Sequence, residues 1–92
     1  MPYYTYIVEC ADTSLYTGCT SNLSLRLFQH NNSKKGARYT KIRRPVVLRY
    51  AEIFETLFLA RHREAEIKRL TRKEKLRLIT NVSPADLSQC CQ

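Results

Sequence analysis

Two short tyrosine-rich runs near the start of the chain constrain its fold most strongly. Tyr3–Cys10 and Leu15–Thr20 are rich in aromatic and β-branched residues, and the four residues Ala11–Ser14 separate them. Runs of this composition are typical of β-strands, and a short polar link between two of them predicts an antiparallel hairpin. We expect the remaining elements to pack around this hairpin.

The register of the hairpin decides whether Tyr6 and Tyr16 can share a site, because side chains alternate between the two faces of a strand. If Cys10 pairs with Tyr16, the loop has five residues and both tyrosines lie on one face. A four-residue loop would place them on opposite faces. The sequence leaves both registers open.

A helix is predicted over residues 22–31, directly after the hairpin. Its leucines recur at helical spacing, so they should dock the helix on the sheet. Arg26 and His30 stand one turn apart on the same side of this helix. We therefore expect both side chains to point along the surface of the hairpin.

Three further elements are predicted after a long loop. Residues 46–54 form a third strand, which we expect to be the most buried, and residues 57–70 form a second helix. Residues 71–80 start with a capping box and form a third helix, with Leu76 and Ile79 facing inward. The predicted fold is of the α/β (α+β) class, a three-stranded antiparallel sheet flanked by helices.

The length and composition favour one small globular domain. Ninety-two residues, 43% of them hydrophobic, suffice for one core. No long apolar run and no signal peptide are recognisable, so we expect no membrane span and a cytoplasmic location. The four cysteines lack the spacing of a zinc site. We expect a domain over residues 1–82 and a short C-terminal tail over residues 83–92.

The basic residues are unevenly distributed. The net charge is +8, and every lysine and arginine except Arg26 follows position 33. A cluster of lysines and arginines that contains no acidic residue favours a phosphate-rich partner, because each contact with nucleic acid releases counterions. The predicted nucleic-acid-binding residues lie in this cluster and include one aromatic side chain: Lys34, Lys35, Arg38, Tyr39, Lys41, Arg43 and Arg44.

Glu64 occupies an unusual position on the predicted second helix. It falls on the same stripe as the apolar residues Leu57, Ala60 and Ile67. A carboxylate at the edge of a core is costly without a partner. The partner is either an arginine at the rim of the core or a metal ion, and the sequence leaves both open.

Together, these residues supply what hydrolysis of a phosphodiester needs. A carboxylate holds a divalent ion, an arginine offsets the charge that grows on the phosphate, and a tyrosine or histidine handles the proton of the attacking water. A free phenol titrates near about 10 and a free imidazole near about 6.5, so His30 is the alternative base to Tyr16 or Tyr6.

The order of these motifs resembles the GIY-YIG endonuclease family. Tyr4-Thr5-Tyr6 and Tyr16-Thr17-Gly18 are similar to its two signature motifs, although Tyr-Thr replaces Gly-Ile and Cys19 replaces the usual Ile. Arg26 and His30 stand where the family has its helical Arg and His, and the AxxxExxIK segment resembles its metal-binding segment. The resemblance covers about residues 3–80 and is strongest to the small stand-alone (YhbQ-like) bacterial type.

The resemblance implies an endonuclease that cleaves DNA with a single Mg²⁺ or Mn²⁺, with a structure-selective role in DNA repair or recombination. By this resemblance Glu64 binds the ion, Arg26 stabilises the transition state, Tyr16 or Tyr6 orients or deprotonates the water, and His30 assists.

Two other classes of function remain. One is a nucleic-acid-binding protein that does not cut, and the other is a subunit that needs a protein partner to position DNA. Phosphate binding alone does not require a core-facing Glu64, which favours the enzyme.

Overall fold

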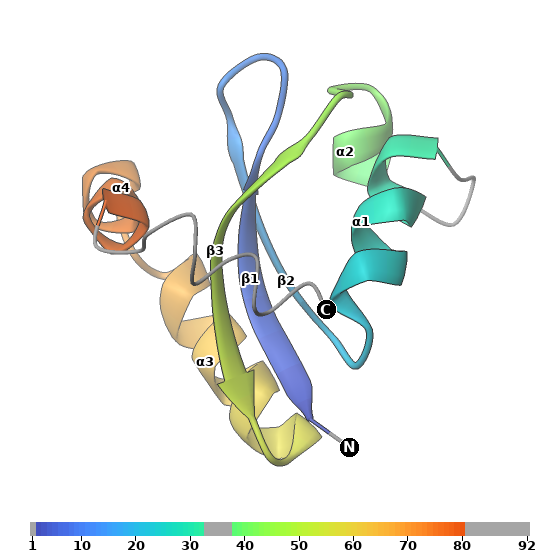
Figure 1. Ribbon diagram of the computed structural model, residues 1–92. Helices are drawn as coiled ribbons and strands as arrows, with labels where there is room; N and C mark the ends of the chain where they lie inside the picture. Colours follow the sequence, from blue (N-terminus) through green and yellow to red (C-terminus); the bar gives the residue numbers. More distant parts are fainter. Residues whose placement is uncertain (1, 33–37, 81–92) are drawn as a thin grey trace.

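A computed structural model describes residues 2–32 and 38–80, so the tail expected over residues 83–92 lies outside the described residues. An antiparallel three-stranded sheet separates α1 and α2 on one side from α3 and α4 on the other (Figure 1), which confirms the predicted α+β fold. In chain order the elements are β1 (Tyr3–Glu9), β2 (Leu15–Thr20), α1 (Leu23–Asn32), α2 (Arg38–Lys41), β3 (Val47–Phe54), α3 (Leu57–Lys68) and α4 (Arg72–Thr80).

The central strand is β1, because the strand order is β2-β1-β3. Tyr6, Ile7 and Val8 of β1 are 1% exposed or less, whereas no residue of β3 is fully buried. The prediction that the third strand is the most buried was therefore wrong. β3 has a neighbouring strand on one side only, while β1 is covered by strands at both edges and by helices on both faces.

The hairpin register keeps the two tyrosines on one face. Tyr6 pairs with Gly18 and Val8 pairs with Tyr16, which is neither of the two registers left open and differs by two residues from the Cys10–Tyr16 pairing. Five residues, 10–14, link the two strands, and the Cys10 backbone N–H donates to the Ser14 carbonyl at 2.9 Å within this link. A shift of two residues preserves the face of every side chain, so Tyr6 and Tyr16 still project together.

Side-chain caps fix the starts of the later helices. The Thr56 hydroxyl accepts a hydrogen bond from the Leu59 backbone N–H at 3.2 Å and begins α3. The predicted capping box of α4 is confirmed, because Thr71 and Glu74 exchange backbone-to-side-chain hydrogen bonds, each 3.2 Å long. α4 buries no residue completely. Leu76 is 39% exposed, so the inward orientation predicted for it was wrong, whereas Ile79 is half-buried.

The core has a layer on each face of the sheet. Beneath α1, Tyr6 and Val8 pack with Leu23 of the helix. On the opposite face, the Thr5 hydroxyl donates a 2.6 Å hydrogen bond to the Ala60 carbonyl and ties α3 to β1. In the described part of the chain, no helix has the length and apolar character needed to span a membrane.

Candidate active site

A buried chain of hydrogen bonds links three elements beneath α1. Nε2 of His30 is 2.8 Å from the Tyr6 hydroxyl, and Nδ1 of His30 is 2.7 Å from the Thr40 hydroxyl. All three side chains are 1% exposed or less. These hydrogen bonds therefore link β1, α1 and α2 through the His30 imidazole ring.

Burial sets the protonation states of His30 and Tyr6. Burial, reinforced by the Arg26 and Arg44 guanidinium groups, lowers the pKa of His30 to about 4. Burial also raises the pKa of Tyr6 to about 12, against the opposing effect of Arg26. His30 is therefore neutral at pH 7, with one ring nitrogen donating and the other accepting. An imidazole with an unperturbed pKa was expected here, and this burial instead favours positioning roles for His30 and Tyr6.

Gly18 makes room for the Tyr6 ring. A Cβ atom added to Gly18 would lie 2.6 Å from the Tyr6 hydroxyl oxygen and 2.8 Å from Cζ of the ring. Because Tyr6 and Gly18 are paired across the hairpin, the ring lies directly over the glycine. The glycine of the Tyr-Thr-Gly motif is therefore a requirement of the Tyr6–His30 contact.

Tyr16 covers the same imidazole from the side and is only half-buried. Its ring meets His30 edge-on with a centroid separation of 5.4 Å and an interplanar angle of 69°. It stacks on Tyr39 of α2 at 5.8 Å, and the guanidinium carbon of Arg43 lies 4.0 Å from the centre of the Tyr39 ring. Tyr16 is therefore more accessible to solvent than Tyr6.

Arg26 completes this half of the site. Its half-buried guanidinium donates from Nη1 to the Gln29 side chain at 3.1 Å. Its charge influences the pKa of both Tyr6 and His30, so the guanidinium lies beside the hydrogen-bonded chain. The structure therefore gathers Tyr6, Tyr16, Arg26 and His30 on one face of the sheet. We call these four residues the tyrosine cluster.

Glu64 approaches from the other face, on α3. Its side chain is 19% exposed and forms an ion pair with Lys68, with 2.8 Å between the carboxylate oxygen and Nζ. Ala60 and Ile67 on the same stripe are fully buried, as the helical wheel predicts. The ion-pair partner in the structure is therefore a lysine one turn along the helix, and not the arginine that was one of the two predicted partners.

The two halves of the site meet at β2, the strand that carries Tyr16 on one face and Cys19 on the other. Burial raises the pKa of the half-buried Cys19 thiol, and the adjacent Glu64 carboxylate adds to this effect. Glu64 also raises the pKa of Lys68, which lies near enough to Tyr16 and Cys19 to interact with both electrostatically. β2 is an edge strand of the described sheet, and Lys68 lies near its residues Tyr16 and Cys19.

Glu64 is the carboxylate that the sequence analysis assigned to a magnesium or manganese ion. Within residues 2–32 and 38–80, no three His, Cys, Asp or Glu side chains gather as a metal-binding group. Mg²⁺, however, is often held by one or two carboxylates, with water and substrate phosphate as its other ligands. A single partly exposed carboxylate beside a strand edge suits that mode of binding.

The basic cluster divides into engaged and exposed side chains. Arg43 pairs with Asp12 at 3.1 Å, and Arg44 donates to the Gln29 carbonyl at 3.1 Å and to the His30 carbonyl. These two arginines, predicted to bind nucleic acid, thus hold α2 and the end of α1 in place. The exposed members are Arg38, Tyr39 and Lys41, while Lys34 and Lys35 lie outside the described residues.

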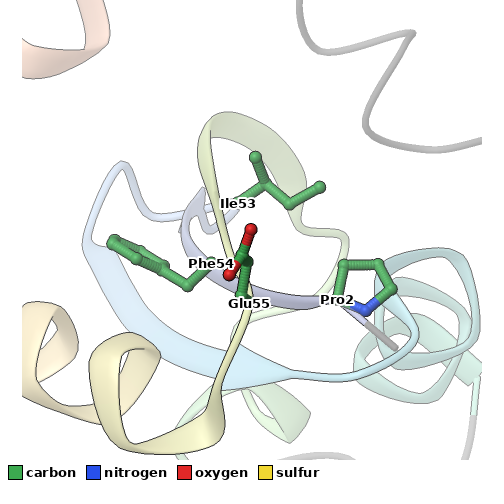
Figure 2. Close-up of a pocket in the computed structure, with 4 residues that line it drawn as sticks. All are labelled: Pro2, Ile53, Phe54 and Glu55. Carbon is green, nitrogen blue, oxygen red and sulfur yellow. The ribbon is translucent and has the colours of Figure 1, made fainter.

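A hollow of about 540 Å³ lies elsewhere, at the end of β3. Its lining consists of Pro2, Ile53, Phe54 and Glu55, shown in Figure 2. None of these residues belongs to the tyrosine cluster, and none is a predicted site residue. The hollow is therefore separate from the candidate site.

Comparison with known proteins identifies the family. The model of the GIY-YIG catalytic domain matches residues 2–77. The chain belongs to the GIY-YIG family. This domain is a nuclease fold, so the family assignment indicates a nucleic acid substrate.

GIY-YIG relatives resemble this chain over most of its length. A UPF0213 protein of Syntrophus aciditrophicus is 53% identical over 76 residues, which cover 83% of this chain and 87% of the relative. UPF0213 protein SH2523 of Staphylococcus haemolyticus is 53% identical over 77 residues, covering 84% and 93%. The solution NMR structure of UPF0213 protein BH0048 from Bacillus halodurans has a TM-score of 0.60 and 37% identity, and covers 96% of this chain and 94% of its own.

Three residues of this GIY-YIG site were missed by the sequence reasoning. Thr40 is ten residues after His30, and nothing in its neighbourhood predicts a buried hydroxyl beside the imidazole. The role of Gly18 was detectable only as part of the Tyr-Thr-Gly motif. Lys68 had a usable signal, because a lysine four residues after a glutamate on a helix is the favoured spacing of an ion pair.

Proposed function

We propose that this GIY-YIG protein is a metal-dependent endonuclease that hydrolyses DNA phosphodiester bonds. The observation that supports this most strongly is the position of β2, which carries Tyr16 of the tyrosine cluster on one face and Cys19, next to Glu64, on the other. A purely binding surface needs cations, but it does not need a buried Tyr6–His30 pair or a carboxylate on the stripe of α3 that carries buried residues.

In this proposal each side chain has a distinct task. Arg26 stabilises the charge that develops on the phosphate in the transition state. Tyr16, the more accessible tyrosine, orients the attacking water. His30 and Tyr6 are positioning residues, because both are buried and their pKa values oppose proton exchange at pH 7. Thr40 fixes the ring orientation of His30 through Nδ1.

Glu64 is the residue that would hold Mg²⁺ or Mn²⁺. When bound, the ion would supply positive charge to the reacting phosphate. The exposed side chains Arg38 and Lys41 would bind the DNA backbone. Backbone contacts carry no direct sequence information, so we propose recognition by DNA structure, in repair or recombination, with a protein partner as an additional means of positioning DNA.

The experiment is cleavage of supercoiled and branched DNA in the presence of Mg²⁺ or Mn²⁺. The intact protein is compared with Glu64→Gln and Arg26→Ala, purified identically. We expect nicking by the intact protein and a loss of at least about a hundredfold in each variant. Equal nicking by all three proteins indicates a contaminant and contradicts the assignment. Tight DNA binding without nicking by the intact protein supports the alternative, a binding protein or a partner-dependent subunit.

A further inference from the structure

The ion pair between Glu64 and Lys68 occupies the carboxylate that the proposed function assigns to the metal. Nζ of Lys68 is 2.8 Å from one carboxylate oxygen of Glu64. This distance is a full hydrogen-bonded contact, so the ammonium group stands where a cation would approach that oxygen. A divalent ion that binds Glu64 must therefore displace or share this contact.

The exposure of the two side chains shows which partner moves more easily. The Lys68 side chain is 53% exposed, whereas that of Glu64 is 19% exposed. Glu64 is held on the stripe of α3 that also carries the fully buried Ala60 and Ile67. The carboxylate is thus fixed by the packing of the helix, while the lysine stem can swing into solvent.

The small free energy of an ion pair such as Glu64–Lys68 means that the contact can be displaced. Exposed lysine–carboxylate pairs one helical turn apart change an equilibrium by only about two- to fivefold. A divalent ion carries twice the charge of an ammonium group and can take phosphate oxygens as further ligands. Lys68 would therefore neutralise Glu64 in the absence of metal, and a divalent ion bound together with substrate phosphate would be able to displace it.

We propose that Lys68 is the internal counter-ion of Glu64 and competes with the divalent ion for its carboxylate, which weakens metal binding in the absence of DNA. This inference rests on the proposed function, because it takes Glu64 as the metal ligand. In chemical terms, Lys68 is a positioning residue that regulates occupancy of the site by the ion. Its consequence is a protein that takes up the metal mainly together with its phosphate substrate.

The test is the binding of Mn²⁺ without DNA, measured by electron paramagnetic resonance. Lys68→Gln removes the competing charge, Glu64→Gln removes the ligand, and Lys73→Gln on α4 removes an exposed positive charge outside the Glu64–Lys68 pair. We expect Lys68→Gln to bind Mn²⁺ about two- to fivefold more tightly than the intact protein. Lys73→Gln should match the intact protein, and Glu64→Gln should lose this site.

The outcomes separate the inference from the proposed function. Unchanged or weaker binding in Lys68→Gln, or equal tightening in Lys73→Gln, overturns the counter-ion role while leaving Glu64 as the ligand. Undiminished Mn²⁺ binding in Glu64→Gln overturns both. A second measurement follows the Lys68 side-chain nitrogen by NMR during a Mg²⁺ titration. Its signal should move in the intact protein and stay fixed in Glu64→Gln, and a fixed signal in both proteins also overturns the inference.

Discussion

Gly18 and Tyr6 face each other across the β1–β2 pair so closely that a Cβ atom on Gly18 would lie 2.6 Å from the Tyr6 hydroxyl oxygen. Gly18→Ala should therefore push the Tyr6 ring away from His30. We expect a loss of about 1–3 kcal/mol in the free energy of unfolding, measured by urea denaturation, together with a loss of nicking activity.

The double variant Gly18→Ala/Tyr6→Phe provides the control for this contact. Removing the hydroxyl deletes the atom nearest to the added methyl group, so the two substitutions should cost less together than the sum of the single effects. Strict additivity would show that the destabilisation by Gly18→Ala has a different origin.

The two hydrogen bonds of His30 can be broken separately. Tyr6→Phe removes the partner of Nε2, and Thr40→Val removes the partner of Nδ1 with little change of volume. Each variant leaves a buried ring nitrogen without its bond, so we expect each to lose about 1–3 kcal/mol of stability in urea denaturation. Tyr16→Phe is the matched comparison, because it should impair nicking while costing less than about 0.5 kcal/mol. A large stability loss in Tyr16→Phe would instead assign its hydroxyl to the fold.

Stability should depend on pH through His30. The unfolded chain binds a proton at this residue near about 6.5, whereas the folded protein does so only at about 4. Between these values the unfolded state binds more protons, so stability falls as the pH decreases through this window and is unaffected by His30 above it. The largest loss is about 3 kcal/mol.

The measurement is the urea midpoint of the intact protein and of His30→Gln between about pH 4 and about pH 7. The variant lacks the imidazole, so its stability should vary less steeply with pH than that of the intact protein. Parallel pH profiles for the two proteins would rule out the low pKa of His30.

The exposed and engaged basic residues should behave differently toward DNA. Arg38→Ala with Lys41→Ala removes two exposed cations, so DNA affinity should fall and the slope of its logarithm against log salt should decrease in magnitude by about two. Arg44→Ala should mainly lower stability, because this guanidinium bonds the carbonyls of Gln29 and His30. The same change of slope in both variants would contradict this division of the basic cluster.

Tyr39 offers a test of the aromatic stack. It lies between the Tyr16 ring and the Arg43 guanidinium, so Tyr39→Ala should free Tyr16 and lower the cleavage rate at saturating DNA about tenfold. Tyr39→Phe preserves the stack and should restore the rate. If both variants instead weaken DNA binding equally with unchanged maximal rate, the Tyr39 hydroxyl contacts DNA and does not support Tyr16.

Local patterns predicted the hairpin, the helices and their caps, but left open whether Tyr6 and Tyr16 share a face. These features depend on residues within one or two turns of each other, where side-chain periodicity is decisive. The edge position of β3 was missed because strand order depends on pairing between segments far apart in sequence. The same reason explains why Leu76 was expected to be buried, since α4 packs beside that edge strand.

The candidate site was predicted residue by residue but not in its internal arrangement. The positions of Arg26 and His30 followed from helical spacing, yet the burial of His30 depends on Thr40, which α2 brings from outside the hairpin and α1. The exposure of a side chain also decides which arginines stabilise the fold through intramolecular contacts and which can bind DNA. Arg43 and Arg44 have ordinary sequence neighbours, so their intramolecular partners were visible only in three dimensions.

The outer edge of β2 limits how this protein can assemble. An unpaired strand edge offers backbone donors and acceptors to any extended chain, including a second copy of the same protein. A strand added to β2 would run alongside the candidate site, whose two halves lie on the two faces of that strand, and would block access to it. If two copies associate by extending the sheet, the site therefore stays accessible only when they pair through β3, at the opposite edge of the sheet.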